Sequence, residues 1–351
     1  MTDRALIFDL NMASLEQVLN SWGEPKYRSR QLWQGLYQNL WQDASQFSNI
    51  PKQLRDRLET TFQFSNLKPG QLLSSRDGET QKTLFTLPDD QAVEAVLMRY
   101  AKRRTLCIST QAGCAMGCVF CATGQMGFRR NLSAGEIIEQ VLYYARLLKA
   151  QDETVTNIVV MGMGEPFHNY EATMEAIERL NDPDGYNFGA RRFTISTVGL
   201  VPAIRRFTKE KSQINLAISL HAADDELRSK LLPINRKYSI ADLMNACLDY
   251  TRTTHRRISF EWALIQGVND SLDQARKLAE LLRDFKSEEA SLCHVNVIPL
   301  NPTRQYPGQA TPHQQALAFQ AELERNHISC TIRIRRGIDI QAGCGQLAIE
   351  R

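Results

Sequence analysis

Apolar side chains recur at helical spacing through the first 65 residues. One helical face would carry Leu32, Trp33, Leu36, Tyr37 and Leu40. Pro51 can open a further helix, because its ring suits the first helical turn, and Ser14 with Gln17 has the spacing of a capping box. The region contains the basic residues Lys26, Arg28, Arg30, Lys52, Arg55 and Arg57. We therefore expect residues 1–65 to form a small basic domain of short helices.

The hydrophobic period changes to that of strands between residues 66 and 100. Strands are expected at 71–75 and 81–87, joined at Asp77-Gly78, a dipeptide typical of hairpin turns. A third strand is expected at 92–100, so that residues 66–100 form a short β extension. This third strand contains Glu94 between apolar neighbours. A glutamate on a strand most often faces solvent, so its position alone indicates no role.

Strand-like and helix-like patterns alternate from residue 101 to residue 335. Strands are expected at 105–110, 156–161, 192–197, 214–219, 257–264 and 293–300. Helices are expected at 133–149, 170–181, 200–209, 224–232, 240–254, 270–286 and 312–326, with a last strand at 329–334. Ser133 and Glu136 predict a capping box on the first of these helices. The alternation predicts an α/β fold, a partial (β/α)6 TIM-like barrel whose lateral opening can admit a macromolecule. Residues 336–351 follow as a C-terminal tail.

Polar segments follow the strands of this expected barrel. They contain Gly164 and Glu165 at the second strand, Ser196 at the third, Ser219, Leu220 and His221 at the fourth, and Asn301 at the sixth. Because chemistry in such barrels takes place at the carboxyl ends of the strands, these residues predict one binding rim. Glu165 could hold an ammonium group, and the hydroxyl, imidazole and amide groups suit ribose hydroxyls and a carboxylate. His221 alone would more often have a structural role.

Composition places the chain among globular proteins. It has 351 residues, 43% of them hydrophobic and 23% charged. No apolar run approaches membrane length, and the first residues do not resemble a signal peptide. Eight cysteines without such a leader indicate reduced thiols and a cytoplasmic protein. The net charge of only +3 does not by itself indicate nucleic-acid binding, but several basic pairs around one cleft would make an RNA-binding rim.

Cys114, Cys118 and Cys121 stand within eight residues. Thiolates hold iron–sulfur clusters, and three of them leave one iron of a four-iron cluster able to chelate a small molecule. A structural zinc site generally takes four ligands from two such knuckles, and no second knuckle follows. Cys344 lies between two glycines. It could be a fourth ligand, a reactive thiol or a bystander, and the glycine setting favours a reactive thiol.

The Cx3CxxC spacing resembles the signature of radical S-adenosylmethionine (SAM) enzymes. Further motifs follow in order: Gly164-Glu165-Pro166, Ser219-Leu220-His221, Pro299-Leu300-Asn301-Pro302 and Gly343-Cys344-Gly345-Gln346-Leu347, with Cys107 seven residues before the first cluster cysteine. With these motifs the chain resembles, over nearly its whole length, the RlmN-type ribosomal RNA adenine C2-methyltransferases. The Cfr-type C8-methyltransferases are a sister group, and the Leu232–Tyr238 stretch resembles the C2 group more.

The resemblance implies a role for each of these site residues. Cys114, Cys118 and Cys121 would ligate one [4Fe–4S] cluster, and SAM would be contacted by Gly164, Glu165, Ser196, Ser219, Leu220, His221 and Asn301. Cys344 would carry the methyl group, and Glu94 would be the general base. Cys107 would release the RNA from its adduct with the protein by forming a disulfide with Cys344. No residue at these positions departs from the family pattern.

The resemblance also implies the substrates and partners. The family substrate is the adenosine at position 2503 of 23S ribosomal RNA, before the ribosome is fully assembled, and many members also modify the adenosine at position 37 of certain transfer RNAs. Two SAM molecules would be used for each methyl group transferred. An external electron donor such as flavodoxin or ferredoxin is expected, and the protein is expected to be a monomer. A zinc-stabilised RNA-binding protein is the rival interpretation, but it leaves Cys107, Cys344 and the polar strand ends unexplained.

Overall fold

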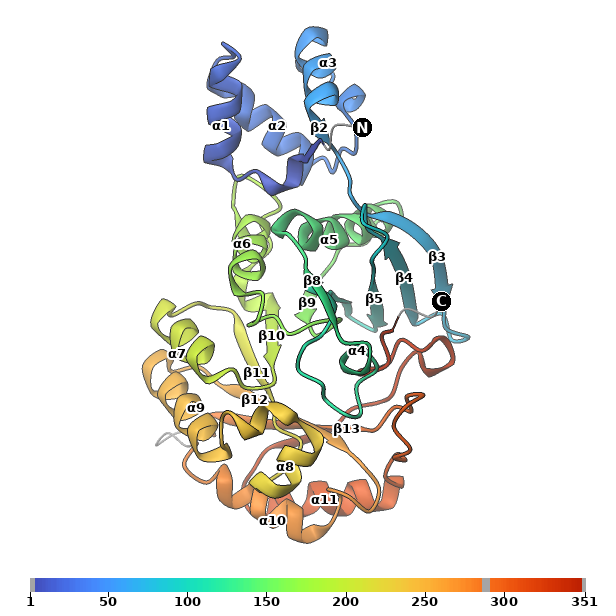
Figure 1. Cartoon of the computed structure of the whole chain (residues 1–351), viewed down its shortest axis with the longest axis vertical. Helices are drawn as coiled ribbons and strands as arrows, with labels where there is room; N and C mark the ends of the chain where they lie inside the picture. The colour runs from blue at the N-terminus through green and yellow to red at the C-terminus, as the bar shows by residue number, and fades with distance from the viewer. Residues whose placement is uncertain (1–3, 286–290, 349–351) are drawn as a thin grey trace.

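The computed structural model describes residues 4–285 and 291–348. Residue 286, at the end of the helix expected at 270–286, lies outside these ranges, as do residues 1–3 and 349–351 of the expected first domain and tail. The described N-terminal part is helical, as predicted (Figure 1). Its elements are β1 (Ala5–Leu6), α1 (Met12–Ser21), α2 (Tyr27–Tyr37), α3 (Lys52–Thr61) and β2 (Phe62–Gln63).

Helix α1 begins differently from the prediction. Asn11, rather than Ser14, is its N-cap, and the Asn11 side chain accepts a hydrogen bond from Ser14 N at 2.8 Å. The capping box predicted for Ser14 and Gln17 is therefore wrong, because the helix starts early enough to place Ser14 inside its first turn. Asparagine and serine are comparably good caps, so composition alone does not separate the two starts.

Within the described residues, ten strands form one continuous sheet in the order β14-β13-β12-β11-β10-β9-β6-β5-β4-β3. Neighbouring strands from β6 to β14 are parallel, and those from β3 to β6 are antiparallel. The parallel strands are β6 (Arg103–Cys107), β9 (Asn157–Val160), β10 (Phe193–Thr197), β11 (Asn215–Ser219), β12 (Ile258–Leu264), β13 (Cys293–Pro299) and β14 (Cys330–Ile332). The predicted α/β barrel of the radical SAM type is confirmed, with β14 adding a seventh parallel strand.

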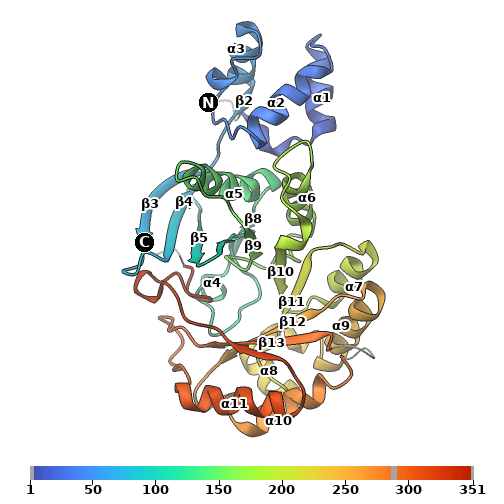
Figure 2. The ribbon, with the colours of Figure 1, turned by 180° about the vertical axis from the view of Figure 1, so that it is seen from behind.

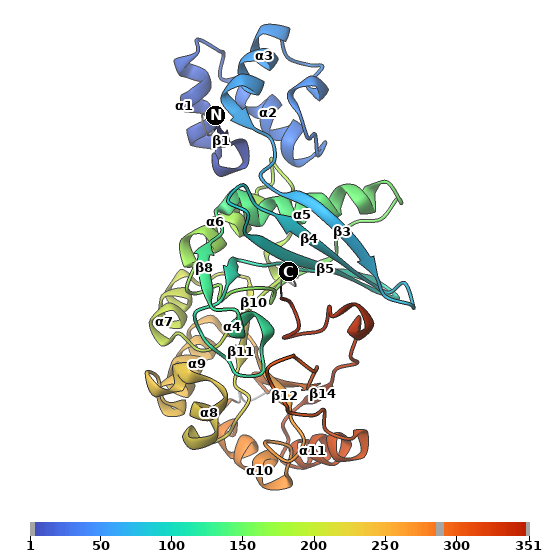
Figure 3. The ribbon, with the colours of Figure 1, turned by 45° about the vertical axis from the view of Figure 1, so that its right-hand side comes forward.

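The hairpin region extends this sheet. Strands β3 (Lys68–Ser74) and β4 (Thr80–Thr86) are joined at the predicted Asp77-Gly78, and β5 (Ala92–Tyr100) lies beside β4 (Figure 3). Strand β5 in turn pairs with β6. Strand β6 ends at Cys107, earlier than predicted. Beyond it the side chain of Gln140 accepts from Ser109 N (2.8 Å) and donates to Ser109 O (2.9 Å). A side chain thus replaces strand pairing for the backbone of Ser109.

Helices lie on the outer side of the parallel strands (Figures 1 and 2). They are α5 (Ala134–Lys149), α6 (Tyr170–Asn181), α7 (Val201–Glu210), α8 (Asp225–Leu231), α9 (Ile240–Thr254), α10 (Leu272–Leu281) and α11 (His313–Arg325). The predicted capping box of Ser133 and Glu136 is confirmed at α5. No described helix has both the length and the apolar character needed to cross a membrane.

The N-terminal helical part is attached to the barrel through the first turn of α5 and the last turn of α6. Asp9 accepts from Gly135 N at 2.9 Å, and the buried Arg179 donates to the carbonyls of Phe8 and Asp9. Because these contacts involve main-chain atoms on at least one side, they fix the orientation of the helical part more firmly than surface side chains could.

Candidate active site

The three cysteines of the Cx3CxxC motif lie on a loop enclosed by its own small sheet. Strands β7 (Gln111–Gly113) and β8 (Phe128–Asn131) pair on either side of it, and α4 (Ala122–Gln125) follows Cys121. Gly113 has φ +73°, and a Cβ there would lie 1.9 Å from Gly127 O, so only glycine allows this closure. Burial raises the pKa of Cys118, and the neighbouring Cys121 and Cys114 thiols raise it further. Three thiolates set this close repel one another unless cations lie between them, so the donor set fits a multi-iron cluster.

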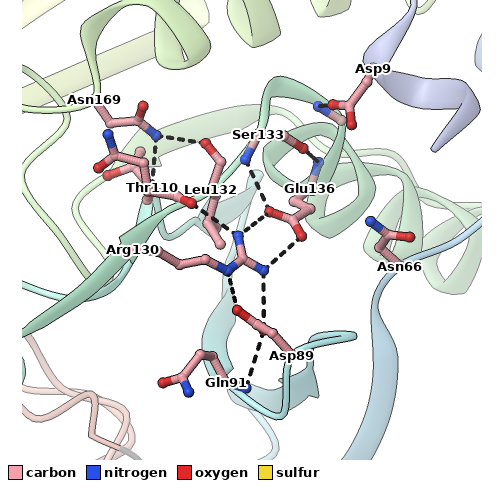
Figure 4. Close-up of polar contacts among 12 residues, drawn as sticks. Asp9, Asn66, Asp89, Gln91, Thr110, Arg130, Leu132, Ser133, Glu136 and Asn169 are labelled. Atoms are coloured by element: carbon pink, nitrogen blue, oxygen red, sulfur yellow. Dashed lines mark hydrogen bonds and ion pairs between the residues drawn. The ribbon is translucent and has the colours of Figure 1, made fainter. Parts of the chain in front are cut away.

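The end of this loop is held by Arg130 on β8 (Figure 4). Its guanidinium donates to both oxygens of Glu136 (2.8 and 2.9 Å) and to Asp89 in the turn between β4 and β5. Glu136 also accepts from Ser133 N at 3.0 Å as part of the α5 capping box. The cluster loop, the start of α5 and the β4–β5 turn therefore form one ion-paired unit, and Arg130 is not the solvated surface cation that a lone basic pair suggests.

Glu165, after β9, is buried. Its two oxygens accept from Phe167 N (3.0 Å) and Val198 N (2.9 Å). Burial raises the pKa of Glu165 to about 7, while hydrogen bonds from Val198, Thr197 and Phe167 oppose the rise. Glu165 therefore joins the loop after β9, which also contains Gly164, to the end of β10.

The remaining polar residues of the predicted rim come together at the ends of β10, β11 and β13. The hydroxyls of Ser196 and Ser219 lie 3.3 Å apart. Asn301 donates through Nδ2 to Cys344 O at 3.0 Å, while its buried Oδ1 has no hydrogen-bond partner within the described residues. An orphaned buried oxygen needs a donor, and a ligand with ammonium or hydroxyl groups, such as SAM, would supply one. The residues present therefore fit SAM.

His221 has a structural contact of the kind its residue type suggests. Its Nδ1 accepts from Ala263 N at 2.8 Å, and its ring meets that of Phe120 edge-on with centroids 5.0 Å apart. Burial, together with the smaller effect of the Arg228 charge, lowers the pKa of His221 to about 3. The imidazole is therefore neutral near pH 7. Leu220 is fully buried beside it.

The segment around Cys344 crosses the carboxyl ends of the strands between β13 and β5 (Figure 3). Ala122 N donates to Gly345 O at 2.8 Å and Thr123 Oγ1 donates to Leu347 O at 2.6 Å, which ties the segment to the helix after Cys121. Gln346 accepts from Gly343 N (3.1 Å) and donates to Pro302 O (3.0 Å). A Cβ on Gly343 would lie 2.6 Å from Asn301 Nδ2, so a larger residue there would displace the Asn301 side chain.

Cys344 is exposed and has two other thiols beside it. Desolvation by the surrounding protein raises the pKa of Cys344 to about 12, and the neighbouring Cys107 and Cys121 thiols contribute to the rise. Burial likewise raises the pKa of Cys107 to about 12. The structure therefore brings Cys344 close both to the predicted resolving cysteine and to a predicted cluster ligand.

Glu94 does not face solvent; it is 4% exposed. Val96 pairs with Cys107 across β5 and β6, so Glu94, two residues before Val96, lies on the same sheet face as Cys107. Its Oε1 is 2.9 Å from Nζ of Lys82, and its Oε2 accepts from Ala348 N at 3.1 Å. Lys82 also donates to Gln341 O at 3.2 Å. The carboxylate thus lies between the hairpin and the Cys344 segment.

Sequence reasoning missed Lys82, Thr123 and Gln346 as partners in this region. Lys82 falls in an alternating strand pattern, where a lysine ordinarily faces solvent, and here it is buried. Gln346 belongs to the motif Gly343-Cys344-Gly345-Gln346-Leu347, and the sequence of this motif does not by itself indicate a role for the glutamine. Within the described ranges, no three His, Cys, Asp or Glu side chains are grouped as a site for a single metal ion.

The predicted basic face of the N-terminal helices is partly neutralised. Lys26 lies 3.5 Å from Glu16, and Arg28 lies 3.7 Å from Glu24. Arg57 stacks over the Trp22 ring at 4.3 Å. Lys26 and Arg30 are exposed and Arg28 is half-buried. Exposed ion pairs contribute little energy, so these cations can still exchange partners with an incoming phosphate.

Known proteins are similar to this chain over almost its whole length. The radical SAM superfamily profile matches residues 108–282, and the profile of the ribosomal RNA large subunit methyltransferase N-terminal domain matches residues 6–63. A probable dual-specificity RNA methyltransferase RlmN from Chloroflexus aurantiacus is 49% identical, with 99% of this chain and 93% of the relative covered. The dual-specificity RNA methyltransferase RlmN 1 of Myxococcus xanthus is 46% identical, with 99% and 96% covered. A crystal structure of a radical SAM methyltransferase from Sphaerobacter thermophilus superposes with a TM-score of 0.94 at 48% identity, covering 98% of this chain and 99% of that one.

Proposed function

The chain belongs to the RlmN family of radical SAM RNA methyltransferases, and we propose that it methylates C2 of the adenosine at position 2503 of 23S ribosomal RNA. We extend the proposal to the adenosine at position 37 of transfer RNAs, because the RlmN relatives are named dual-specificity enzymes. The C8-methyltransferase activity of the sister group is the alternative that the experiment below distinguishes.

The meeting of Cys344, Cys107 and Glu94 carries this proposal. Methylation of a nitrogen or oxygen needs no thiol pair beside the SAM site. Here one exposed thiol lies next to a second, half-buried thiol, and a buried carboxylate lies on the same sheet face as the second. This is the set of groups needed to carry a methyl group, release it and remove a proton.

Adenine C2 is an electron-poor aryl carbon without a nucleophilic lone pair, so direct transfer of a methyl cation from SAM cannot occur there. When bound at Cys114, Cys118 and Cys121, the [4Fe–4S] cluster would supply the electron that cleaves SAM into methionine and a 5′-deoxyadenosyl radical. The rim residues Gly164, Glu165, Ser196, Ser219, Leu220, His221 and Asn301 would hold and orient SAM.

The protein thiols and Glu94 would act in a fixed order. Cys344 loses its proton and accepts a methyl group from one SAM. A hydrogen atom then leaves this S-methyl group for the deoxyadenosyl radical from a second SAM, and the carbon bonds to adenine C2. Glu94 accepts the C2 proton and the adduct gives up its unpaired electron to the oxidised form of the external electron carrier, which leaves a thioether between Cys344 and C2. Cys107 then loses its proton and attacks the Cys344 sulfur, and the carbon takes up a proton as the methylated base leaves with a Cys107–Cys344 disulfide behind it. External electrons must reduce that disulfide, and flavodoxin or ferredoxin is the proposed donor to the cluster.

Mass spectrometry of nucleosides tests the proposal. Anaerobically purified, cluster-loaded protein is incubated with SAM, reduced flavodoxin and either protein-free 23S ribosomal RNA or assembled large subunits. We expect 2-methyladenosine from the protein-free RNA and little from assembled subunits, and the same product from transfer RNA. Exclusive 8-methyladenosine would overturn the regiochemistry. Absence of any methylated adenosine, together with SAM cleavage, would overturn the RNA substrates.

A further inference from the structure

Arg228 on α8 is buried, and among the described residues no carboxylate forms an ion pair with its guanidinium. The side chain is 0% exposed. It donates to four neutral oxygens: Val198 O (2.7 Å), Asn235 Oδ1 (2.8 Å), Leu220 O (3.1 Å) and Ser219 O (3.2 Å). Arginine keeps its proton in proteins. A buried cation surrounded only by neutral acceptors is costly, so a negative partner is expected nearby.

Asp225 is the nearest carboxylate that acts on Arg228, and it is an insufficient partner. Asn235 separates the two, because its Oδ1 accepts from Arg228 and its Nδ2 donates to Asp225 Oδ1 at 2.8 Å. Asp225 itself is exposed, so water screens its charge. Burial lowers the pKa of Arg228 to about 10, and Asp225 is among the groups that only partly oppose that lowering.

The cluster loop lies on the inner side of Arg228. Leu231, one helical turn after Arg228, accepts from Val119 N at 3.1 Å, and Val119 directly follows Cys118. Cys118 packs in one apolar group with Leu231 and Leu232. Figure 1 shows α8 beside the loop that leads into α4. The helix that carries Arg228 therefore packs against the loop of a predicted cluster ligand, and the Arg228 charge opposes the rise in the pKa of Cys118.

We propose that Arg228 is the buried counter-charge of the [4Fe–4S] cluster and raises its reduction potential. The proposal rests on the assignment of Cys114, Cys118 and Cys121 as cluster ligands. A cluster held by three thiolates is negatively charged, and reduction by one electron adds to that charge. A fixed cation near Cys118 stabilises the reduced form more than the oxidised form, since net charge and local environment set the potential of such clusters.

Arg228 also positions the strand ends of the SAM site. Val198 is held at its carbonyl by Arg228 and at its N–H by Glu165 (2.9 Å). The carbonyls of Ser219 and Leu220 belong to two residues predicted to contact SAM. One side chain thus joins the ends of β10 and β11 to the cluster loop, and SAM lies where these elements meet according to the proposed function.

A redox titration of the cluster, followed by electron paramagnetic resonance, tests the charge. Arg228→Gln removes the charge and keeps a hydrogen-bond donor, whereas Arg228→Lys keeps the charge without the planar fork. We expect Arg228→Gln to lower the ratio of reduced to oxidised cluster at least about tenfold at a fixed potential, a shift of about 59 mV to more negative values. Arg228→Lys should stay closer to the unchanged protein. Arg179→Gln is the matched control, because Arg179 is also buried and bonded to carbonyls but at the N-terminal part, and it should leave the potential unchanged.

Melting temperatures measured with and without cluster complete the test. In cluster-free protein Arg228→Gln should melt at or above Arg228→Lys, because an uncompensated charge has been removed, and cluster loading should reverse that order. Equal potentials for Arg228→Gln and the unchanged protein would overturn the proposal, as would equal shifts for the Gln and Lys variants. If neither variant retains iron, a melting temperature of Arg228→Gln below that of Arg228→Lys in cluster-free protein would overturn it. Lack of iron and of a cluster signal in the unchanged protein would instead contradict the ligand assignment.

Discussion

The side-chain amide of Asn301 donates a hydrogen bond of 3.0 Å to the main-chain carbonyl of Cys344. This bond joins the end of β13, where SAM binding is proposed, to the residue proposed to carry the methyl group. The Oδ1 atom on the same amide is buried without a partner in the part of the chain that the structure describes. Asn301 can therefore bind the ligand through its oxygen and hold the methyl carrier through its nitrogen.

Separating these two contacts gives the first prediction. Asn301→Asp keeps an acceptor for the ligand but loses the donor to Cys344, and a lost hydrogen bond of about 1 kcal/mol corresponds to a roughly fivefold effect. We expect Cys344 methylation, measured by mass spectrometry of the intact protein, to slow about fivefold while SAM still binds. Asn326→Asp, which changes an exposed amide on the far side of the barrel, should slow neither. Normal methylation in Asn301→Asp would show that the bond does not position Cys344.

The cluster ligands give the second prediction. Cys114→Ala, Cys118→Ala and Cys121→Ala should each lose iron, SAM cleavage and RNA methylation together, because the remaining two thiolates cannot hold a four-iron core. Iron and sulfide content of anaerobically purified protein measures the loss. Cys330→Ala removes a buried thiol on β14 that has no proposed role, and it should retain iron. Full iron and activity in any of the first three variants would contradict the ligand assignment.

Local pattern was sufficient to predict most of the sheet. The alternation of strands and helices predicted the six parallel strands from β6 to β13, and β5 was predicted with its bounds, because each is a local apolar run between turn signals. The start of α1 could not be decided, since both Asn11 and Ser14 can cap a helix. The continuity of the hairpin with the main sheet also had no local signal, because pairing of β5 with β6 depends on contacts between strands.

The side-chain pairs of the site could not be predicted from the sequence for a related reason. Lys82 and Glu94 meet only because β4 and β5 are in register, and an isolated lysine or glutamate on a strand suggests a solvent-facing position. The burial of Arg228 depends on two separate strand ends, those of β10 and β11, converging on one helix. The roles of Glu94, Cys107, Cys344 and the cluster cysteines stay predictions, although the structure brings Cys344 and Cys107 close together.

The N-terminal helices give the third prediction. Changing Lys26, Arg28 and Arg30 together to Glu should weaken RNA binding at least about tenfold at low salt and flatten its dependence on salt, since fewer phosphate contacts release fewer counterions. SAM cleavage without RNA should be unaffected. The matched control reverses Arg252 on α9, Lys277 on α10 and Arg283, which follows α10. Helices α9 and α10 lie at the far end of the molecule from α1, α2 and α3 (Figure 1). Equal RNA affinity for both triple variants would assign another role to the N-terminal part.

His221 gives a prediction about pH. Its pKa is lowered from 6.5 to about 3 in the folded protein, so between those values the unfolded chain binds a proton that the folded chain does not. The contribution of His221 to stability is complete above pH 6.5 and should fall by about 1.4 kcal/mol for each pH unit below it. Urea unfolding of cluster-free protein at several pH values measures this slope. His221→Asn, whose amide oxygen can accept from Ala263 N, should unfold with a smaller slope between pH 6 and pH 4, and an identical slope would refute the buried neutral imidazole.

The two thiols outside the cluster give the last prediction. If Cys107 and Cys344 were structural, removing either should have similar mild effects. The proposed chemistry requires different ones. Cys344→Ala has no sulfur to accept the first methyl group, so neither a methylated protein nor an RNA product should form. Cys107→Ala should still load Cys344 and attack adenine, and then stop, because no thiol can break the bond between the carbon and the Cys344 sulfur.

The stalled Cys107→Ala protein should therefore accumulate crosslinked to RNA. The adduct should appear as a band shift that survives denaturant and disappears after nuclease digestion. Glu94→Gln should trap the same adduct one step earlier, since the C2 proton must leave before that bond can break, and C2-deuterated adenosine would show the label retained only in this variant. Cys247→Ala and Cys293→Ala, which remove buried thiols on α9 and β13, should turn over normally. Normal turnover by Cys107→Ala, or a crosslink formed by Cys344→Ala, would reverse the roles proposed for the two residues.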